Sequence, residues 1–381
     1  MVAARLVTAS GRAEGDYRAA AAPCHVFPAR PVSLASGGRR GIIRAMTPAL
    51  ALPLFAAVAA AVVLATGLVL RWLRRRQILD RPNDRSSHSL PTPRGGGLAV
   101  MAVLLPAWGL AAPDSLAGGA GPVQIALLCA AGLAAVSWLD DLRGLPPLPR
   151  FLAQGLAVAV VLALLPGEAL VFQGALPLAL DRLLTALGWL WFINLYNFMD
   201  GIDGITGVET ASIGGGVAVL AAAGLAAPVL LGPGVVVLAA ALGFLVWNWH
   251  PAKLFMGDVG SVPLGFLLGL LLITLAVEGQ LAAALILPLY HIADATLTLL
   301  RRLRRGEKPW EAHRSHFYQR AVRGGLSHGR VSGAVAVANL GLIGCAVVAA
   351  AGLPWLGLLA AVALVAALLA ALSRRAVPMD G

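Results

Sequence analysis

Charged residues and cysteines are both scarce in this chain of 381 residues. Asp, Glu, Lys and Arg make up only 12% of the sequence, against about a quarter of an average soluble domain, and 59% of the residues are hydrophobic. A soluble globular protein is therefore excluded, and a multi-spanning membrane protein is expected. The three cysteines (Cys24, Cys129 and Cys345) lie far apart, which excludes a disulfide framework and a zinc site of clustered cysteines.

Acidic residues are also few, since 18 Asp and Glu stand against 29 Lys and Arg, and the net charge is +11. Such a balance can indicate a nucleic-acid partner. Here the basic residues flank apolar runs, so membrane topology explains them better, and no nucleic acid is expected to bind.

The chain is rich in long apolar runs. Eleven of them approach the ~20 residues that cross the hydrocarbon of a bilayer. The sequence therefore predicts an all-α polytopic membrane protein of about eleven transmembrane helices. The predicted spans are residues 49–70, 97–112, 121–139, 150–166, 182–198, 209–227, 229–247, 260–277, 281–299, 330–351 and 354–372.

The basic residues gather on one side of these spans. Counting Arg150 and Arg330 at span edges, 21 of the 29 Lys and Arg residues share a side with loop 71–96. Apart from seven arginines in residues 1–45, Arg182 is the only basic residue on the opposite side. The positive-inside rule makes the first side cytoplasmic. Its loops are residues 71–96, 140–149, 199–208, 248–259 and 300–329, with a tail at 373–381.

Acidic residues mark three of these cytoplasmic loops. Asp140 and Asp141 are adjacent at the end of a span, where two carboxylates repel each other and oppose the helix dipole unless a cation neutralises them. Mg²⁺ is the natural candidate, because it prefers hard oxygen ligands. Asp258 lies in a glycine-flanked turn where another span begins, which suits a metal or phosphate site.

The third acidic loop is Asn194–Val208. Asn197, Asp200 and Asp203 are spaced three apart, so one helical turn would place them on one face. The glycines between them let backbone come close to a ligand. The alternative is a loop of solvated Asp-Gly turns, but the location of all three acidic motifs on one side favours a site.

Basic residues that suit phosphate oxygens lie in the loop Asp80–Gly97, namely Arg85, His88 and Arg94. The alternative for this loop is contact with anionic lipid headgroups.

His313, Arg314 and His316 form a second basic group in the longest loop. The sequence offers no nearby third ligand for zinc there, so a pyrophosphate partner is the better functional interpretation. The alternative is a basic amphipathic helix on the membrane surface.

Carboxylates for Mg²⁺ and basic groups for phosphates on one membrane side indicate phosphoryl transfer to a lipid acceptor. The rival from another class is a transporter of a phosphorylated metabolite, which would place ionisable residues near the bilayer centre. The interiors of the predicted spans are nearly free of charge, and His291 and Asp294, near the cytoplasmic end of the ninth span, are the exceptions.

The order of these motifs resembles the polyprenyl-phosphate N-acetylhexosamine-1-phosphate transferase family, glycosyltransferase family 4. The resemblance covers about residues 46–375 and is carried by Asp80–Gly97, Asp140-Asp141, Asn194–Gly204 and Leu254–Ser261. It implies an enzyme of the bacterial inner membrane that transfers a sugar 1-phosphate from a UDP-N-acetylhexosamine to undecaprenyl phosphate and releases UMP. The implied cofactor is Mg²⁺, with Mn²⁺ as an alternative ion. Membrane lipids surround the protein, and a homodimer is compatible with the family.

The resemblance also implies roles for individual residues. Asp140 would act as base toward the lipid phosphate, with Asp141 beside it and Asp200 as a further catalytic acid, while Asp258 and Asp140 would hold the metal. The residues implied to bind the nucleotide sugar are Asn197, Asp200, Asp203, Phe255 (stacked on uracil), His313, Arg314 and His316, and those implied to bind phosphate or lipid are Arg85, His88 and Arg94.

One loop departs from the family's muramoyl-pentapeptide enzymes. Residues 313–320 read His-Arg-Ser-His-Phe-Tyr-Gln-Arg in place of their His-rich motif. This resembles the branch that begins O-antigen, and hence lipopolysaccharide, or other surface polysaccharides. Phospho-MurNAc-pentapeptide transferase of peptidoglycan synthesis stays as the alternative.

The first 45 residues are expected to be a disordered or misassigned extension, with a transferase domain at 46–375 and a short tail at 376–381. The seven arginines of residues 1–45 would have to cross the membrane, which opposes the positive-inside bias. We expect a chain that begins at Met46 to insert and turn over normally. Mass spectrometry of the native amino terminus and an activity assay on the shortened chain check this. Peptides from residues 1–45 in the native protein, together with an inactive shortened chain, would contradict it.

Overall fold

The computed structural model describes residues 48–80, 91–111, 120–308 and 313–376. The expected extension at 1–45, all but the first residue of the expected tail at 376–381, and Arg85 and His88 of the first basic group lie outside these residues.

The described residues are mostly helical and contain almost no strand, so the predicted all-α class is confirmed. The helices are α1 (Pro48–Arg76), α2 (Gly97–Ala111), α3 (Ala120–Arg143), α4 (Pro147–Leu164), α5 (Leu178–Phe198), α6 (Ile205–Ala222), α7 (Leu231–Asn248), α8 (Asp258–Leu275), α9 (Leu281–Ile286), α10 (Leu289–Arg304), α11 (Phe317–Arg323), α12 (His328–Ala350) and α13 (Pro354–Arg374). A 3₁₀ turn, η1 (Pro228–Leu230), precedes α7, and a π-turn, η2 (Ala276–Gln280), follows α8. The two-residue strands β1 (Leu79–Asp80) and β2 (Thr92–Pro93) pair antiparallel.

Among the described residues, nine helices are long and apolar enough to cross a membrane, and α2 is a shorter apolar helix of 15 residues. The chain is therefore a multi-pass membrane protein. The predicted pair 209–227 and 229–247 is two separate helices, α6 and α7, joined through η1.

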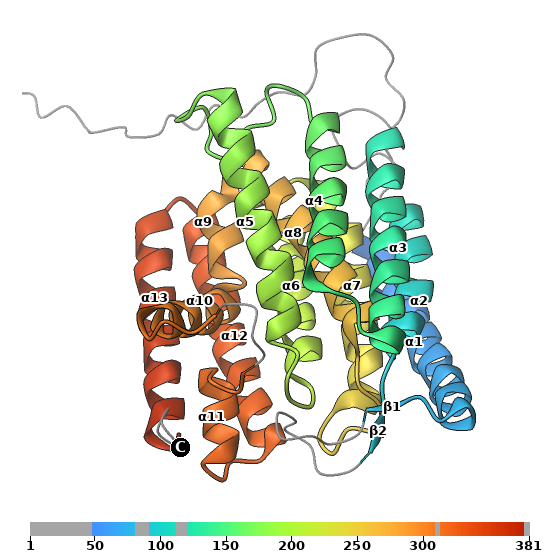
Figure 1. The fold of residues 1–381 in the computed structure, drawn as a ribbon. Coiled ribbons are helices and arrows are strands. Elements are labelled where there is room, and N and C mark those ends of the chain that lie inside the picture. The colour runs from blue at the N-terminus through green and yellow to red at the C-terminus, as the bar shows by residue number, and fades with distance from the viewer. Residues whose placement is uncertain (1–47, 81–90, 112–119, 309–312, 377–381) are drawn as a thin grey trace, which may run out of the picture. The chain divides into compact units, whose positions relative to one another are not determined.

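The predicted single span over residues 281–299 is wrong. Gly279 adopts φ 89°, a left-handed conformation that ends the helical path from α8, and α9 then lasts only six residues. Pro288, which has no backbone N–H to donate, precedes α10. The last turn of α10 carries Arg301, Arg302 and Arg304, and Figure 1 shows the helix crossing the direction of its neighbours.

Helices α6, α7 and α8 are mostly buried, whereas α1, α4 and α13 expose most of their surface. Glycines allow the buried helices to approach closely. A Cβ atom at Gly234 of α7 would meet the α6 backbone at Gly214 and Ala218 within 2.8–3.1 Å. Small residues at helix crossings are the usual means of tight packing where lipid replaces water.

The closest approach joins α2 to α8. A Cβ atom at Gly97 would overlap the backbone Cα and N of Gly260, so only glycine allows the two helix starts to touch. The backbone N–H of Gly97 donates to the Met256 carbonyl at 2.8 Å. This contact holds the segment before α2 against the segment before α8. In Figure 1, β1, β2 and α11 lie at the same end of the helices, which we call the site end.

Gly97→Ala is expected to destabilise the protein by about 1–3 kcal/mol or more, because the added methyl group must displace backbone rather than a flexible side chain. Thermal unfolding in detergent measures the loss. The matched control is Gly155→Ala within α4, where a Cβ atom meets nothing within 4 Å. That change should be neutral or stabilise by about 0.5–1 kcal/mol through helix propensity. Equal melting temperatures for the two variants would contradict the close packing of α2 on α8.

Candidate active site

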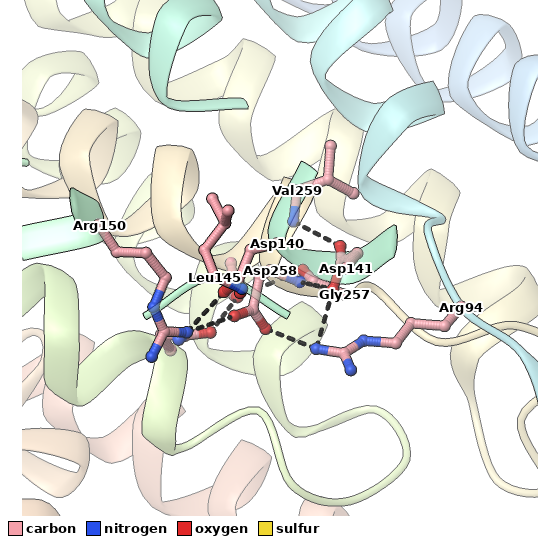
Figure 2. A network of polar contacts seen from close by, with 10 residues as sticks. Arg94, Asp140, Asp141, Leu145, Arg150, Gly257, Asp258 and Val259 are labelled. Atoms are coloured by element: carbon pink, nitrogen blue, oxygen red, sulfur yellow. Dashed lines mark hydrogen bonds and ion pairs between the residues drawn. The ribbon is translucent and has the colours of Figure 1, made fainter. Parts of the chain in front are cut away.

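Three carboxylates converge at the site end from two helices. Asp140 and Asp141 lie in the last turn of α3, and Asp258 is the first residue of α8. The Asp141 side chain is 2% exposed and that of Asp258 is 16% exposed. Figure 2 shows these three carboxylates, the acid triad, between two arginines. The structure therefore brings together the two acidic motifs that lie more than a hundred positions apart in the sequence.

Asp141 caps the start of α8. Its carboxylate accepts the backbone N–H of Asp258 at 3.1 Å and of Val259 at 2.9 Å. The N-terminus of a helix has unpaired N–H groups and a partial positive charge, so a carboxylate there is stabilising. Gly257 precedes this cap with φ 76°, and a Cβ atom on it would lie 2.8 Å from the Asp141 carboxylate. Asp141 thus fixes where Asp258 stands.

Two arginines bridge the acid triad. Arg94 Nη2 lies 2.9 Å from Asp141 Oδ1 and 2.7 Å from Asp258 Oδ1. Arg150 Nη1, in the first turn of α4, lies 2.5 Å from Asp140 Oδ2 and 3.4 Å from Asp258 Oδ2. Asp140 also accepts the backbone N–H of Leu145 at 2.6 Å. Each arginine therefore joins one acid of α3 to Asp258 of α8 (Figure 2).

Arg94 is held in place by backbone pairing with the loop before α8. Phe255 N–H donates to the Pro93 carbonyl at 2.9 Å, and Gly95 and Gly96 donate to the Phe255 carbonyl at 3.2 and 2.9 Å. Burial alone would lower the pKa of the Arg94 guanidinium, but the charges of Asp141 and Asp258 outweigh it and raise that pKa. Arg94 is therefore a permanent cation beside Asp141 and Asp258.

The donor set fits a divalent cation. Asp140 and Asp258 lie close enough for their side chains to interact directly, and two such carboxylates are stable together only with a cation or a shared proton between them. Carboxylate oxygens are the ligands that Mg²⁺ takes, with water or phosphate oxygens completing its shell. The residues present therefore fit the Mg²⁺ site predicted at Asp258 and Asp140.

The turn between α5 and α6 faces the same site. Asn197, in the last turn of α5, accepts a hydrogen bond from Ser261 Oγ at 2.6 Å, one turn along α8 from Asp258. Asp200 accepts a 2.5 Å hydrogen bond from Thr206 Oγ1. Burial raises the pKa of the Asp200 carboxyl to about 6, although Thr206 and Arg94 oppose the shift. Asp200 is thus poised to change its charge slightly below neutral pH.

Asp203 has different neighbours from the other residues of this turn. Its carboxylate lies against His250 and His328 rather than against Asn197 and Asp200. The three-residue spacing predicted a common face for these acids, but the turn is not a continuous helix, because α5 ends at Phe198 and α6 begins at Ile205.

The loop with the second basic group is anchored on Asp294 of α10. His316 Nδ1 lies 3.1 Å from Asp294 Oδ1, and the backbone N–H of Phe317 donates to the same oxygen at 3.0 Å. Tyr318 then donates through its hydroxyl to the Phe198 carbonyl at the end of α5, at 3.2 Å. This chain of contacts places the loop beside the α5–α6 turn.

His313 of this loop differs from the basic residue that the sequence predicted. Burial, followed by the charges of His316 and Arg302, lowers the pKa of His313 to about 3, so its ring is neutral at pH 7. The side chain of His316 is 4% exposed and faces Asp294. His313 therefore offers a neutral N–H to a ligand, and the guanidinium of Arg314 is the permanent charge of the predicted group.

Sequence reasoning missed Arg150, which it counted only as a basic residue at a span edge. Its position ten residues after Asp140, within the first turn of the following helix, was the available signal. It also missed His250, His328 and Thr206, because no spacing in the sequence relates them to Asp200 and Asp203.

Comparison with known proteins finds similar transferases. The family model described as glycosyl transferase family 4 matches residues 123–276, which include the acid triad. A protein of Bacillus subtilis described as a probable undecaprenyl-phosphate N-acetylglucosaminyl 1-phosphate transferase is 28% identical over 283 residues, covering 70% of this chain and 76% of that protein.

Two mycobacterial relatives are similar over the same share of the chain. The decaprenyl-phosphate N-acetylglucosaminephosphotransferase of Mycolicibacterium smegmatis is 32% identical over 308 residues, 70% of this chain and 74% of that protein. Its counterpart in Mycobacterium leprae is 30% identical over 304 residues, 70% of this chain and 75% of that protein. The chain therefore belongs to glycosyl transferase family 4, among the polyprenyl-phosphate N-acetylglucosamine-1-phosphate transferases.

Proposed function

We propose that the protein transfers an N-acetylhexosamine 1-phosphate from a UDP-sugar to undecaprenyl phosphate and releases UMP, as the first membrane step of O-antigen or another surface polysaccharide. The observation that carries the proposal is the acid triad between Arg94 and Arg150 at one end of a membrane bundle. The relatives' names, which specify N-acetylglucosamine and a polyprenyl phosphate, support the substrate class.

Phosphoryl transfer of this kind depends mostly on positioning and on charge. Asp258 and Asp140 would hold Mg²⁺, which supplies positive charge to the diphosphate when bound. An oxygen of the lipid phosphate attacks the β-phosphorus, the bond from that phosphorus to the bridging oxygen breaks, and UMP leaves. Asp140 takes any proton from the attacking phosphate, while Arg94 and Arg150 provide guanidinium N–H groups for phosphate oxygens.

The nucleotide would lie along the segment that contains Phe255. The backbone of Phe255 is fixed on both sides by hydrogen bonds to residues 93–96, and its ring is half-buried, which supports a role as a platform for uracil. Asn197, which contacts Ser261 of α8, and Asp200 would border the nucleotide, whereas Asp203 lies against His250 and His328. His313 and Arg314 would face the sugar or its phosphate.

The site end is proposed to face the cytoplasm, where UDP-sugars are made. The asymmetry of Lys and Arg supports this orientation. The position of the acid triad disfavours the transporter alternative, because these acids lie at helix ends rather than midway along a broken helix.

The first test is a substrate panel. Membranes that contain the protein should transfer radiolabelled sugar 1-phosphate from UDP-N-acetylhexosamines to undecaprenyl phosphate, and Asp258→Asn should lower the rate by about 100- to 1,000-fold. The variant must retain the wild-type melting temperature for the comparison to count. No transfer from any UDP-sugar, or near-normal turnover by the variant, would contradict the proposal. Transfer from UDP-MurNAc-pentapeptide alone would establish the peptidoglycan alternative.

Arg150 provides a second, more specific prediction. Arg150→Gln should slow transfer by at least about tenfold and weaken its dependence on Mg²⁺ concentration, because Asp140 and Asp258 lose a shared cation. The matched control is Arg143→Gln, which removes an exposed arginine at the end of the same α3 turn. Equal activity of the two variants would show that Arg150 plays no part in the reaction.

The raised pKa of Asp200 predicts a pH dependence. Its carboxylate is ionised above about pH 6 and protonated below, so the rate should fall as the pH drops through 6 if the charged form is needed. Because the folded-state pKa lies above the ordinary value, protonation favours the fold, and this fall does not reflect unfolding. Infrared difference spectra should show a protonated-carboxyl band that appears near pH 6 and is missing in Asp200→Asn. A band that persists in the variant would assign the titration to another group.

A further inference from the structure

A second cluster of ligand-type side chains lies beside the acid triad but is separate from it. Asp203 of the α5–α6 turn, His250 of the α7–α8 loop and His328 at the start of α12 meet at one point. We call them the His–Asp–His cluster. The proposed reaction gives no role to either histidine.

The nitrogen and oxygen atoms converge. His250 Nδ1 lies 2.6 Å from Asp203 Oδ2, and His328 Nδ1 lies 3.2 Å from Asp203 Oδ1. One ligand atom from each of the three residues lies within 4.8 Å of the others, and the two imidazole ring centres are 5.3 Å apart. Both rings thus present the same kind of nitrogen to one carboxylate.

Neighbouring hydrogen bonds hold Asp203 in place. Asp203 Oδ2 also accepts the backbone N–H of Ala252 at 3.2 Å, and the Asp203 carbonyl accepts Ser332 Oγ at 2.7 Å. Asn248 Oδ1 accepts the backbone N–H of Gly204 at 3.0 Å. A site whose ligands are fixed before binding loses little entropy when it binds.

Access to the cluster is from the side of His250. The side chain of His250 is 37% exposed, whereas those of Asp203 and His328 are 8% and 10% exposed. A ligand can therefore enter past His250, and water can complete its coordination. Hydrogen bonds from His328 and His250 outweigh burial and lower the pKa of Asp203, so the carboxylate is anionic at neutral pH.

Two imidazole nitrogens and a carboxylate oxygen suit a borderline transition metal such as Zn²⁺ rather than Mg²⁺. With metal–ligand bonds of about 2.0–2.1 Å, tetrahedral coordination separates ligand atoms by about 3.3 Å. The His328–Asp203 distance already fits. The His250 Nδ1 contact is to the other carboxylate oxygen, Oδ2, and must lengthen by about 0.7 Å; half-exposed His250 can move outward.

We propose that Asp203, His250 and His328 bind a borderline transition metal such as Zn²⁺. The bound metal would cross-link the three segments around the reaction centre. When the metal binds, it replaces any proton shared between His250 and Asp203. The α5–α6 turn that contains Asp200, the loop that contains Phe255 and the start of α12 then share one cross-link. The site is independent of the Mg²⁺ site at the acid triad and of the identity of the sugar.

The test measures metal on the purified full-length protein, prepared with an affinity tag that contains no histidine or cysteine. Excess Mg²⁺ is present, so that the hard acid triad is occupied. We expect the wild type to retain one equivalent of Zn²⁺ after gel filtration and to bind Co²⁺ with a visible absorption spectrum typical of low coordination number. His250→Gln and His328→Gln should each lower the metal affinity at least about tenfold.

His313→Gln is the matched control, because it removes a histidine of the other pair and should leave the metal content at one equivalent. A wild type that binds no Zn²⁺ or Co²⁺, or a stoichiometry unchanged in both cluster variants, would overturn the proposal. The cluster would then be a hydrogen-bonded clamp only.

A further measurement tests the metal site even if the His→Gln variants fail to fold. Pulsed electron paramagnetic resonance of Cu²⁺ on the unmodified protein counts coordinated imidazoles, and two are expected. His250→Asp, at the half-exposed position, keeps a ligand atom and should retain the metal with an altered Co²⁺ spectrum. One or no coordinated imidazole would overturn the proposal. None of these measurements uses a UDP-sugar, so a failed transfer assay and a failed metal assay remain separate results.

Discussion

Repulsion among three carboxylates at the edge of a membrane is the constraint on which the site end depends. Asp140, Asp141 and Asp258 approach one another closely, and Arg94 and Arg150 occupy the positions that make this stable. Breaking a buried pair of this kind leaves an uncompensated charge, which costs far more than an exposed pair contributes. The end of α3, the start of α4, the start of α8 and the segment before α2 must therefore meet. A bound divalent cation can take the place of an arginine beside these carboxylates. A diphosphate can likewise take the place of a carboxylate beside these arginines, so the charge balance is kept.

Close approach of backbones makes this meeting possible. Gly97 lies directly on Gly260, and Gly257 adopts a positive φ that aims the start of α8 at the Asp141 carboxylate. Side chains at these positions would separate α2 from α8 and move Arg94 away from Asp258. The ion pairs at the site end therefore depend on close helix packing in the bundle. The glycines set distances that the charged groups then stabilise.

The α5–α6 turn connects two sites of different chemistry. Asp200 lies near enough to Arg94 and Asp258 for their charges to affect its pKa, and the hard carboxylate oxygens there suit Mg²⁺. Asp203 faces His250 and His328, where imidazole nitrogens suit a softer metal. Tyr318 donates a hydrogen bond to the Phe198 carbonyl, so the loop that carries His313 and Arg314 also contacts this turn.

The sequence by itself determined the membrane class, most of the spans, the grouping of acidic and basic motifs on one side, and the family. These follow from composition and from hydrophobic runs, which act locally along the chain. Only the tertiary structure decided that Arg150 belongs with Asp140 and Asp258, that Asp203 turns away from Asp200 toward His250 and His328, and that residues 281–299 break at Pro288. The physical reason is that charge pairing and backbone contact depend on distances between helices. Periodicity records which face of a helix is apolar, but it does not record which charged group from another helix lies opposite.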